Sequence, residues 1–223
     1  MKLADPAHPH LAAVCSGQIQ VVGEGRHAHR SGIHKHPHRG IVLVDARGVP
    51  GDEIGDVEDH GGPDQALYAY AAEDAAWWEA QLDRPLPAGA FGENLRTVGL
   101  DPTAARIGER WRIGTEVEVE VTAPRIPCAT LAAAWDEPGI GPRFLRAGRL
   151  GAYLRVTTPG RIAAEDPVDL IAPAPDAPSV AEVAVIRTRE RHRAAELLEV
   201  PGIAHRLVEW AARVTGPRVT EAP

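Results

Sequence analysis

Hydrophobic and polar residues alternate most regularly in the middle of the chain. Between residues 116 and 121, three valines alternate with three glutamates, within a longer stretch of β character that runs from Ala105 to Ala123. A period of two places successive side chains on opposite faces of a strand. The valine face is therefore expected to be buried and the glutamate face to be exposed to solvent.

Shorter stretches carry weaker signals of the same kind. β-branched residues that gather between Gly and Pro turns predict strands over 41–44, 65–70, 153–158 and 168–171, and a bent strand or hairpin over 10–23. Many short strands with only isolated helices between them predict a mainly β fold. We expect a closed or nearly closed β-barrel with a few peripheral helices.

Helical spacing of apolar residues is limited to short segments in this part of the chain. It predicts helices over 73–82, 129–135 and 143–147, the first of which is stopped by Pro85 and Pro87. Helices of this length are marginal by themselves, so they are expected to pack on the sheet.

A proline-rich segment marks the most probable domain boundary. Residues 172–178 contain three prolines and three alanines and are expected to form an extended linker. This divides the chain into a β-barrel domain at 1–171 and a small C-terminal domain at 179–223.

The C-terminal domain is expected to contain three helices. Ser179 precedes Glu182 by three residues, which is the spacing of a helix-capping box, and further helical stretches follow over 190–199 and 203–215. The last stretch carries an apolar stripe that needs a covering surface. We expect it to dock onto the barrel or onto a second subunit.

Composition and charge exclude several classes of protein. The chain has 223 residues, of which 44% are hydrophobic and 25% charged, and only two are cysteines, so collagen-like and disulfide-rich scaffolds are excluded. A formal net charge of −7 argues against general nucleic-acid binding. No apolar stretch has the length of a signal peptide or a membrane span. These features predict a cytoplasmic protein with no nucleic-acid or membrane partner.

Cys128 is the strongest candidate for chemistry. It ends the segment Pro124–Cys128, directly after the alternating strand, where prolines restrict the backbone and the cationic Arg125 favours a thiolate. A thiolate is a nucleophile and a ligand for soft metals. The alternative is a small buried hydrophobic residue, which is the commoner role of an unpaired cysteine and the preferred one for Cys15.

Two glycine-containing segments carry other candidate groups. His60 precedes Gly61 and Gly62, and it is either a proton carrier or a turn residue. The run Gly92-Glu93-Asn94 places a glycine beside a carboxylate and an amide. A glycine in such a place either lets a ligand approach closely or forms an ordinary bulge.

A histidine-rich segment lies near the N-terminus. Its five histidines fall within twelve residues and surround Lys35, with Arg30 and Arg39 nearby; they are His27, His29, His34, His36 and His38. Zinc or nickel binding, binding of an anionic group, and a solvated loop all remain open for this segment.

These segments belong to a series of short motifs that follow one another in a definite order. The series consists of Ser31–Lys35, Gly51–Asp52 with Asp56, His60–Asp64, Phe91–Leu95, Ile107–Gly108, Pro124–Cys128, and Gly151–Tyr153 with Pro159-Gly160. In this order it resembles the MOSC domain family, named for the C-terminal domain of molybdenum cofactor sulfurase, and within it the YiiM-type subgroup. The resemblance spans about residues 10–171, and the helices from 179 onward resemble an additional helical domain of that subgroup.

The resemblance implies a β-barrel that binds a molybdenum–pterin cofactor (molybdopterin). Cys128 then contributes sulfur to the metal, and His60 becomes the candidate proton carrier. The residues implied to hold the pterin phosphate and ring edges are Lys35, Arg125, Asn94, Glu93 and Gly92. Relatives of this type are linked to the reduction of N-hydroxylated compounds, including hydroxylaminopurine base analogues.

Three functions therefore remain in competition. The first is a molybdenum-dependent reductase of a small molecule; because no flavin, dinucleotide or iron–sulfur motif is present, its electrons are expected from a separate reductase or ferredoxin-like protein. The second is a sulfur carrier that holds a persulfide on Cys128. The third is a non-catalytic module whose histidine-rich loop binds metal. A homodimer is compatible with each of them.

Overall fold

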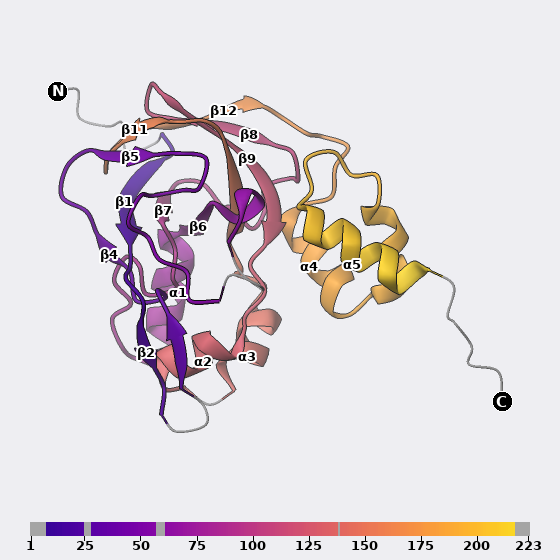
Figure 1. Cartoon of the computed structure of the whole chain (residues 1–223), viewed down its shortest axis with the longest axis horizontal. Coiled ribbons are helices and arrows are strands. Elements are labelled where there is room, and N and C mark those ends of the chain that lie inside the picture. Colours follow the sequence, from indigo (N-terminus) through magenta and orange to yellow (C-terminus); the bar gives the residue numbers. More distant parts are fainter. Residues whose placement is uncertain (1–7, 25–27, 57–60, 138, 217–223) are drawn as a thin grey trace.

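The computed structural model of the chain describes residues 8–24, 28–56, 61–137 and 139–216. Most of it is one eight-stranded mixed sheet with helices around it, as Figure 1 shows. The strand order is β12-β8-β9-β10-β6-β7-β1-β4, and all neighbouring strands are antiparallel except β6 and β7. The strands are β1 (His10–Ser16), β4 (His36–Pro37), β6 (Leu67–Ala71), β7 (Leu95–Val98), β8 (Arg110–Ile113), β9 (Val117–Pro124), β10 (Ala152–Thr158) and β12 (Val168–Ala172).

Two short two-stranded sheets accompany the large sheet. Strand β2 (Gln20–Val22) pairs with β3 (His29–Ser31), and β5 (Val42–Val44) pairs with β11 (Gly160–Ile162), both antiparallel. The strands predicted at 41–44, 153–158 and 168–171 are thus confirmed within a residue or two. The strand predicted at 65–70 begins later, because Pro63–Gln65 forms a 3₁₀ helix (η2).

A closed barrel is not confirmed, although the expected large sheet with a few helices is. The hydrogen-bonded order ends at β12 on one side and at β4 on the other. An isolated bridge joins His10 at the start of β1 to Pro167, just before β12. This bridge brings two edges of the sheet together over a short distance, without a continuous ladder between them.

The alternating segment folds as its pattern predicts. Val117, Val119 and Val121 on β9 are each 0% exposed, and burying a valine side chain stabilises the fold by about 1.5–3 kcal/mol. The prediction of one long β stretch over 105–123 was too simple, because the chain reverses at Gly114, whose φ is +60°. Antiparallel pairing of β8 with β9 requires this turn, and glycine adopts it without strain.

The three helices predicted before the linker are confirmed. They are α1 (Ala72–Leu82), α2 (Ala129–Trp135) and α3 (Ile140–Ala147), the last starting three residues earlier than predicted. Aromatic side chains hold them together: the rings of Trp78 on α1 and Phe144 on α3 stack with centroids 5.5 Å apart, and Trp135 on α2 packs edge-on against Phe91 at 4.8 Å. This aromatic cluster fixes the position of α2, whose first turn carries Cys128.

The C-terminal helices are α4 (Val180–Thr188), η3 (Arg191–Leu197) and α5 (His205–Thr215). The predicted capping box is present, because Glu182 N donates to Ser179 Oγ at 3.1 Å and Ser179 N donates to Glu182 Oε2 at 2.7 Å. The middle segment is a 3₁₀ helix rather than an α-helix. Within the described residues, no helix has the length and apolar character needed to cross a bilayer.

These helices dock onto the sheet of the same chain. Val180, Val183 and Trp210 belong to the same buried cluster as Trp111 and Val119 of the sheet, and Figure 1 shows α4 and α5 beside β8 and β9. The expected apolar stripe is therefore covered in cis. The division into two domains at residues 172–178 stays a prediction, since the two parts share one core.

Candidate functional site

A pocket with a volume of about 110 Å³ opens to solvent where several loops and strand ends meet. The walls of the pocket come from several parts of the chain. They include the segment that follows β3, the segment that follows β5, the loop that precedes β7, and the connection between β9 and α2. The lining residues include Ser31–Ile33, Lys35, Asp52–Asp56, Gly61, Gln65, Tyr68, Gly92, Asn94, Arg125, Cys128, Thr130 and Tyr153.

The pocket brings together five of the seven predicted site residues. Lys35, Gly92, Asn94, Arg125 and Cys128 all contribute to its wall. Glu93 lies behind the wall, and His60 lies outside the described residues, so its predicted role stays a prediction. These five residues come from three separate segments of the sequence, and only the folded chain places them around one space.

Cys128 occupies the N-cap of α2. Its backbone is extended, with φ −115° and ψ 175°, as is typical of an N-cap residue, because the helix starts at Ala129. The side chain is partly buried and lines the pocket. A sulfur atom at this place is accessible to a ligand from the pocket side, as the prediction of a reactive cysteine requires.

Arg125 is the most unusual cation of the site. Its side chain is only 5% exposed, and its Nη1 atom is buried with no hydrogen-bond partner in the part of the chain that the structure describes. The guanidinium lies over the ring of Phe144, 5.9 Å from its centroid. A buried donor without a partner costs about 1–3 kcal/mol, so this group is arranged for a partner that approaches through the pocket.

Lys35 has a partner of its own. Its ammonium donates to both carboxylate oxygens of Asp52, and Asp52 also accepts from Asn94 Nδ2 at 2.8 Å and from Gly17 N at 2.8 Å. The sequence placed Asp52 only within a short motif of the series and gave it no role, so its place at the centre of this network was missed. The Gly51-Asp52 motif was the signal in the sequence that pointed to it.

Asn94 and Glu93 hold the wall in place from behind. Asn94 Oδ1 accepts from Tyr68 N at 3.1 Å, and its Nδ2 also donates to Cys15 O at 3.2 Å. Glu93 is 0% exposed, pairs with Arg96 and accepts from the amide nitrogens of Gly89 and Phe91. Their contacts with protein are thus established, and their predicted contacts with a cofactor stay predictions.

Gly92 fits a place where a side chain would crowd the wall. Its φ is +78°, and a Cβ atom there would lie 3.0 Å from Ile33 Cγ1. The positive φ and the close contact both favour glycine at this position. Without a side chain here, the backbone of the loop remains accessible from the pocket.

Two tyrosines of the wall were not predicted as functional. Tyr68 donates its hydroxyl hydrogen to Leu150 O at 2.7 Å. Tyr153 lies next to it, with ring centroids 5.4 Å apart. Burial raises the pKa of the Tyr153 phenol, and the positive charge of Arg125 opposes this shift. The Gly151–Tyr153 motif contained this residue, but nothing in the sequence showed which way its side chain points.

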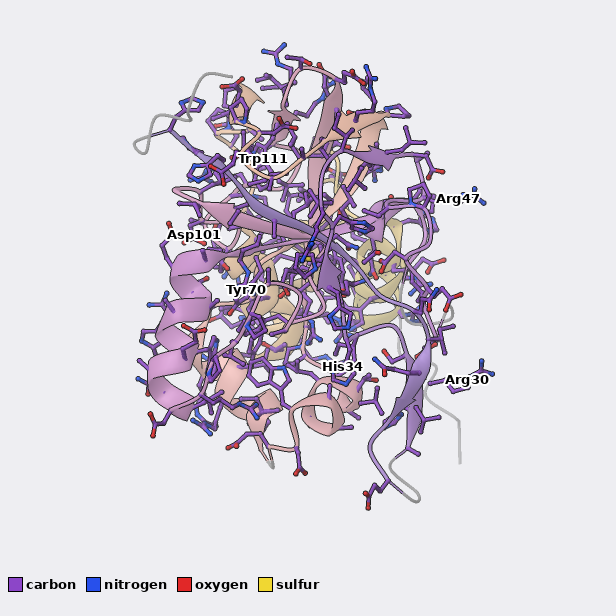
Figure 2. All side chains as sticks on the ribbon, turned by 90° about the vertical axis from the view of Figure 1, so that its left-hand side faces the viewer. Arg30, His34, Arg47, Tyr70, Asp101 and Trp111 are labelled. Atoms are coloured by element: carbon purple, nitrogen blue, oxygen red, sulfur yellow. The ribbon has the colours of Figure 1, made fainter. Side chains whose placement is uncertain are left out.

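The histidine-rich segment does not form a metal centre in the described part of the chain. No group of three or more His, Cys, Asp or Glu side chains there is arranged to hold a metal ion, and His27 lies outside that part. His38 bonds through Nε2 to Ser16 Oγ at 2.7 Å on the surface. Arg30 on β3 contributes to the wall of the pocket, and its exposed side chain points away from the body of the protein (Figure 2).

The residues of the pocket fit a cofactor that carries both a soft metal and an anionic group. Cys128 offers one sulfur ligand, and thiolates bind soft metals. Arg125 offers a buried nitrogen donor without a partner among the described residues, and guanidinium groups suit phosphate. A metal that takes its other ligands from a pterin needs only one from the protein, so the missing three-residue cluster does not oppose this fit.

Comparison with known proteins identifies the family. YflK of Bacillus subtilis, described as uncharacterized, is 38% identical over 132 residues, which are 59% of each chain. Protein YiiM of Escherichia coli is 34% identical over 176 residues, 78% of this chain and 76% of that one. A protein of Gibberella moniliformis named Reductase is 35% identical over 145 residues, 63% of this chain but only 26% of the relative.

The structural comparison gives the same result over nearly the whole chain. The crystal structure of YiiM from Geobacillus stearothermophilus superposes with a TM-score of 0.76 and 27% identity, covering 92% of this chain and 98% of that one. The family model that matches is described as the MOSC domain, and it matches residues 56–169, which include Cys128 and most of the sheet. The chain therefore belongs to the MOSC domain family.

Proposed function

We propose that this protein is a molybdenum-cofactor-dependent reductase of small N-hydroxylated compounds, supplied with electrons by a separate donor protein. The observation that carries the proposal is the presence, in one pocket, of the Cys128 thiol and of an Arg125 guanidinium nitrogen that has no hydrogen-bond partner among the described residues. Membership of the MOSC domain family and the relative named Reductase support the same class of activity.

Each residue of the pocket has a defined task in this proposal. Cys128 is the protein ligand of the metal, because its sulfur is the soft donor of the wall. Arg125 binds the anionic end of the cofactor, where it gains the hydrogen-bond partner that the described chain does not provide. Lys35 and Asn94 act through Asp52, because both donate hydrogen bonds that hold its carboxylate in place. The negative charge of this carboxylate in turn balances the positive charge of Lys35 at the pocket wall.

The bound cofactor supplies the two-electron redox chemistry of the reaction. The protein contributes binding, orientation and partial exclusion of water. The electrons for the reduction come, in this proposal, from a separate reductase or ferredoxin-like protein, because the sequence lacks flavin, dinucleotide and iron–sulfur motifs.

The proposal is tested by elemental analysis and by a reduction assay. Full-length protein, purified from a host that makes the cofactor, is expected to contain molybdenum at a stoichiometry near one per chain. It is also expected to reduce 6-hydroxylaminopurine to adenine with an artificial electron donor. Protein that lacks molybdenum after purification from such a host contradicts the proposal.

The same preparation decides the sulfur-carrier alternative. A persulfide on Cys128 adds the mass of one sulfur atom, and a thiol reagent removes it. Intact-mass measurement after loading with a sulfur donor detects this addition. A labile sulfur on a protein without molybdenum favours the carrier, whereas an unmodified thiol excludes it.

A further inference from the structure

The hydroxyl groups of the three tyrosines differ in their partners. Tyr68 donates to Leu150 O at 2.7 Å and Tyr70 donates to Arg149 O at 3.0 Å. The hydroxyl of Tyr153 makes no such bond to any residue that the structure describes, and its side chain is only partly buried where it lines the pocket. Two phenols are thus occupied by the backbone, and the third is available to a ligand.

The backbone places Tyr153 close to the two groups of the proposed chemistry. It lies on β10 directly opposite Ala123 of β9, two residues before Arg125. Its ring packs on Tyr68 with centroids 5.4 Å apart, which restricts the direction in which the hydroxyl points. Tyr153 is therefore held by a strand and by an aromatic contact, and precise positioning of this kind is what a catalytic group requires.

Burial favours the neutral form of the Tyr153 phenol. Burial raises its pKa, the positive charges of Arg125 and Arg206 lower it, and negative charge on Cys128 raises it. These groups face it from the loop after β9, from α5 and from the start of α2, and Tyr68 faces it from β6. A neutral phenol is a hydrogen-bond donor, and Arg125 is placed to stabilise the phenolate that forms when the proton leaves.

We propose that Tyr153 is a catalytic residue, which donates a hydrogen bond and then a proton to the oxygen of an N-hydroxyl group bound in the pocket. This assignment rests on the proposed function. It gives the pocket a proton donor within the described structure and independent of His60.

The proton and electron balance of the step is simple. Conversion of R–NH–OH to R–NH₂ and water consumes two electrons and two protons, and the electrons come from the separate ferredoxin-like or reductase protein. The N–O bond breaks, the departing oxygen keeps its own hydrogen and takes the proton of Tyr153, and the nitrogen takes the second proton from solvent. The phenolate then regains a proton from solvent.

Transfer of the proton from the Tyr153 phenol to the departing oxygen is energetically favourable. Hydroxide that leaves without a proton is the conjugate base of water, whose pKa is about 15.7, well above the ordinary value of a phenol. A positioned general acid typically contributes about 10²–10⁴-fold to a rate. Loss of the hydroxyl is thus expected to affect turnover far more than substrate affinity.

The test compares wild type with Tyr153→Phe and with Tyr70→Phe as a matched control. All three proteins are full-length and come from a cofactor-competent host, and 6-hydroxylaminopurine is the substrate. Tyr153→Phe is expected to lower kcat by about 100-fold with KM changed by no more than about threefold. Tyr70→Phe removes a phenol that bonds the backbone outside the pocket, and its kcat is expected to stay within about twofold.

A second measurement does not depend on turnover. Calorimetric titration of the oxidised proteins without electron donor gives the affinities for 6-hydroxylaminopurine and for adenine, which lacks the oxygen. Wild type is expected to prefer 6-hydroxylaminopurine, and Tyr153→Phe to lose roughly fivefold of that preference. Tyrosinate absorbance during an alkaline titration identifies Tyr153 separately. Burial raises the pKa values of Tyr68 and Tyr70 more strongly, so Tyr153 should ionise first. This first ionisation should be absent in Tyr153→Phe.

The outcomes separate the two proposals. An active wild type together with a Tyr153→Phe variant of nearly full kcat overturns the role of Tyr153 and leaves the reductase intact. A wild type that contains molybdenum but reduces no N-hydroxyl compound overturns the reductase, and the titrations then decide about Tyr153 alone. In that case an unchanged preference in Tyr153→Phe overturns the contact with the oxygen as well.

Discussion

The two cysteines of this chain occupy opposite kinds of environment. Cys15 lies inside β1, is 0% exposed and donates its backbone N–H to Asn94 O at 2.7 Å. Cys128 lies at the N-cap of α2, in the wall of the pocket. The side chains are identical, but the sulfur of Cys15 is buried, whereas that of Cys128 faces the pocket.

Electrostatics increases this difference. Burial raises the pKa of the Cys15 thiol to about 12, and the negative charge of Glu93 adds to the shift. A thiol of this kind stays protonated and behaves as a small hydrophobic side chain. The comparison teaches that the backbone, by placing one cysteine inside a strand and the other at the start of a helix, decides which sulfur is available for chemistry.

Alkylation gives the largest expected contrast. At pH 8 only about one Cys15 thiol in 10⁴ is ionised, given its pKa of about 12, and its sulfur is enclosed. Iodoacetamide should therefore modify Cys128 at least ~1000-fold faster than Cys15 in the folded protein. Peptide mapping by mass spectrometry over time measures both rates, and similar rates for the two residues would break the comparison.

Alanine substitutions sharpen the contrast in function. Cys128→Ala removes the proposed metal ligand and is expected to abolish bound molybdenum and to lower reductase activity by at least ~100-fold. Cys15→Ala should retain activity within about threefold, while losing about 1–2 kcal/mol of unfolding free energy because a buried sulfur is removed. Metal analysis, the reduction assay and denaturant unfolding of both variants provide the measurements. Equal losses of activity would contradict the assignment.

Alkaline pH exposes the cost of ionising Cys15. Its pKa is raised from 9.0 to about 12 in the folded protein, so the unfolded chain loses the proton first. The protonated Cys15 thiol therefore contributes to the free energy of unfolding below pH 9, and this contribution disappears as the pH rises toward 12. By pH 10 the free energy of unfolding has fallen by about 1.4 kcal/mol. Unfolding free energies of wild type and Cys15→Val, compared at pH 7 and pH 10, isolate this contribution. A variant with the same pH dependence as wild type would refute it.

Arg125 provides the smallest expected change in stability and a test of the Cys128 environment. Arg125→Met removes a buried cation that has one nitrogen without a partner in the described chain. We expect the cofactor-free protein to become more stable by about 1 kcal/mol and its binding of pyrophosphate to weaken roughly tenfold. Thermal unfolding and calorimetry measure these effects. Arg47→Met, at a side chain that is 92% exposed and outside the pocket wall, is the control and should change neither quantity.

Local sequence patterns predicted helices and strands well where the hydrophobic pattern was long or where a helix began with a capping motif. The valine face of β9, the helix over 129–135 and the Ser179–Glu182 capping box all have the predicted form. Each depends on contacts between near neighbours, or on which face of one strand is apolar. The closed or nearly closed barrel is not confirmed, and the β character over 105–123 is interrupted by a turn at Gly114. Closure and reversal depend on pairing between distant segments, which the patterns do not contain.

The candidate site was predicted less completely. The motif series pointed to Cys128, Arg125 and Lys35, and the structure places all three at one pocket. It did not show that Lys35 is bound to Asp52, and it assigned no role to Tyr153. The direction of a side chain and its partners across the sheet are not encoded in the spacing of a motif.

By itself, the sequence determined which segments become strands and helices and which residue types are available for chemistry, because hydrophobic periodicity and helix caps act over a few neighbouring residues. The tertiary structure alone decided which cation is paired, which sulfur is enclosed and which phenol is left for a ligand. The physical reason is that burial and hydrogen bonding at the pocket arise between segments far apart in the chain, whose meeting depends on the order of strands in the completed sheet.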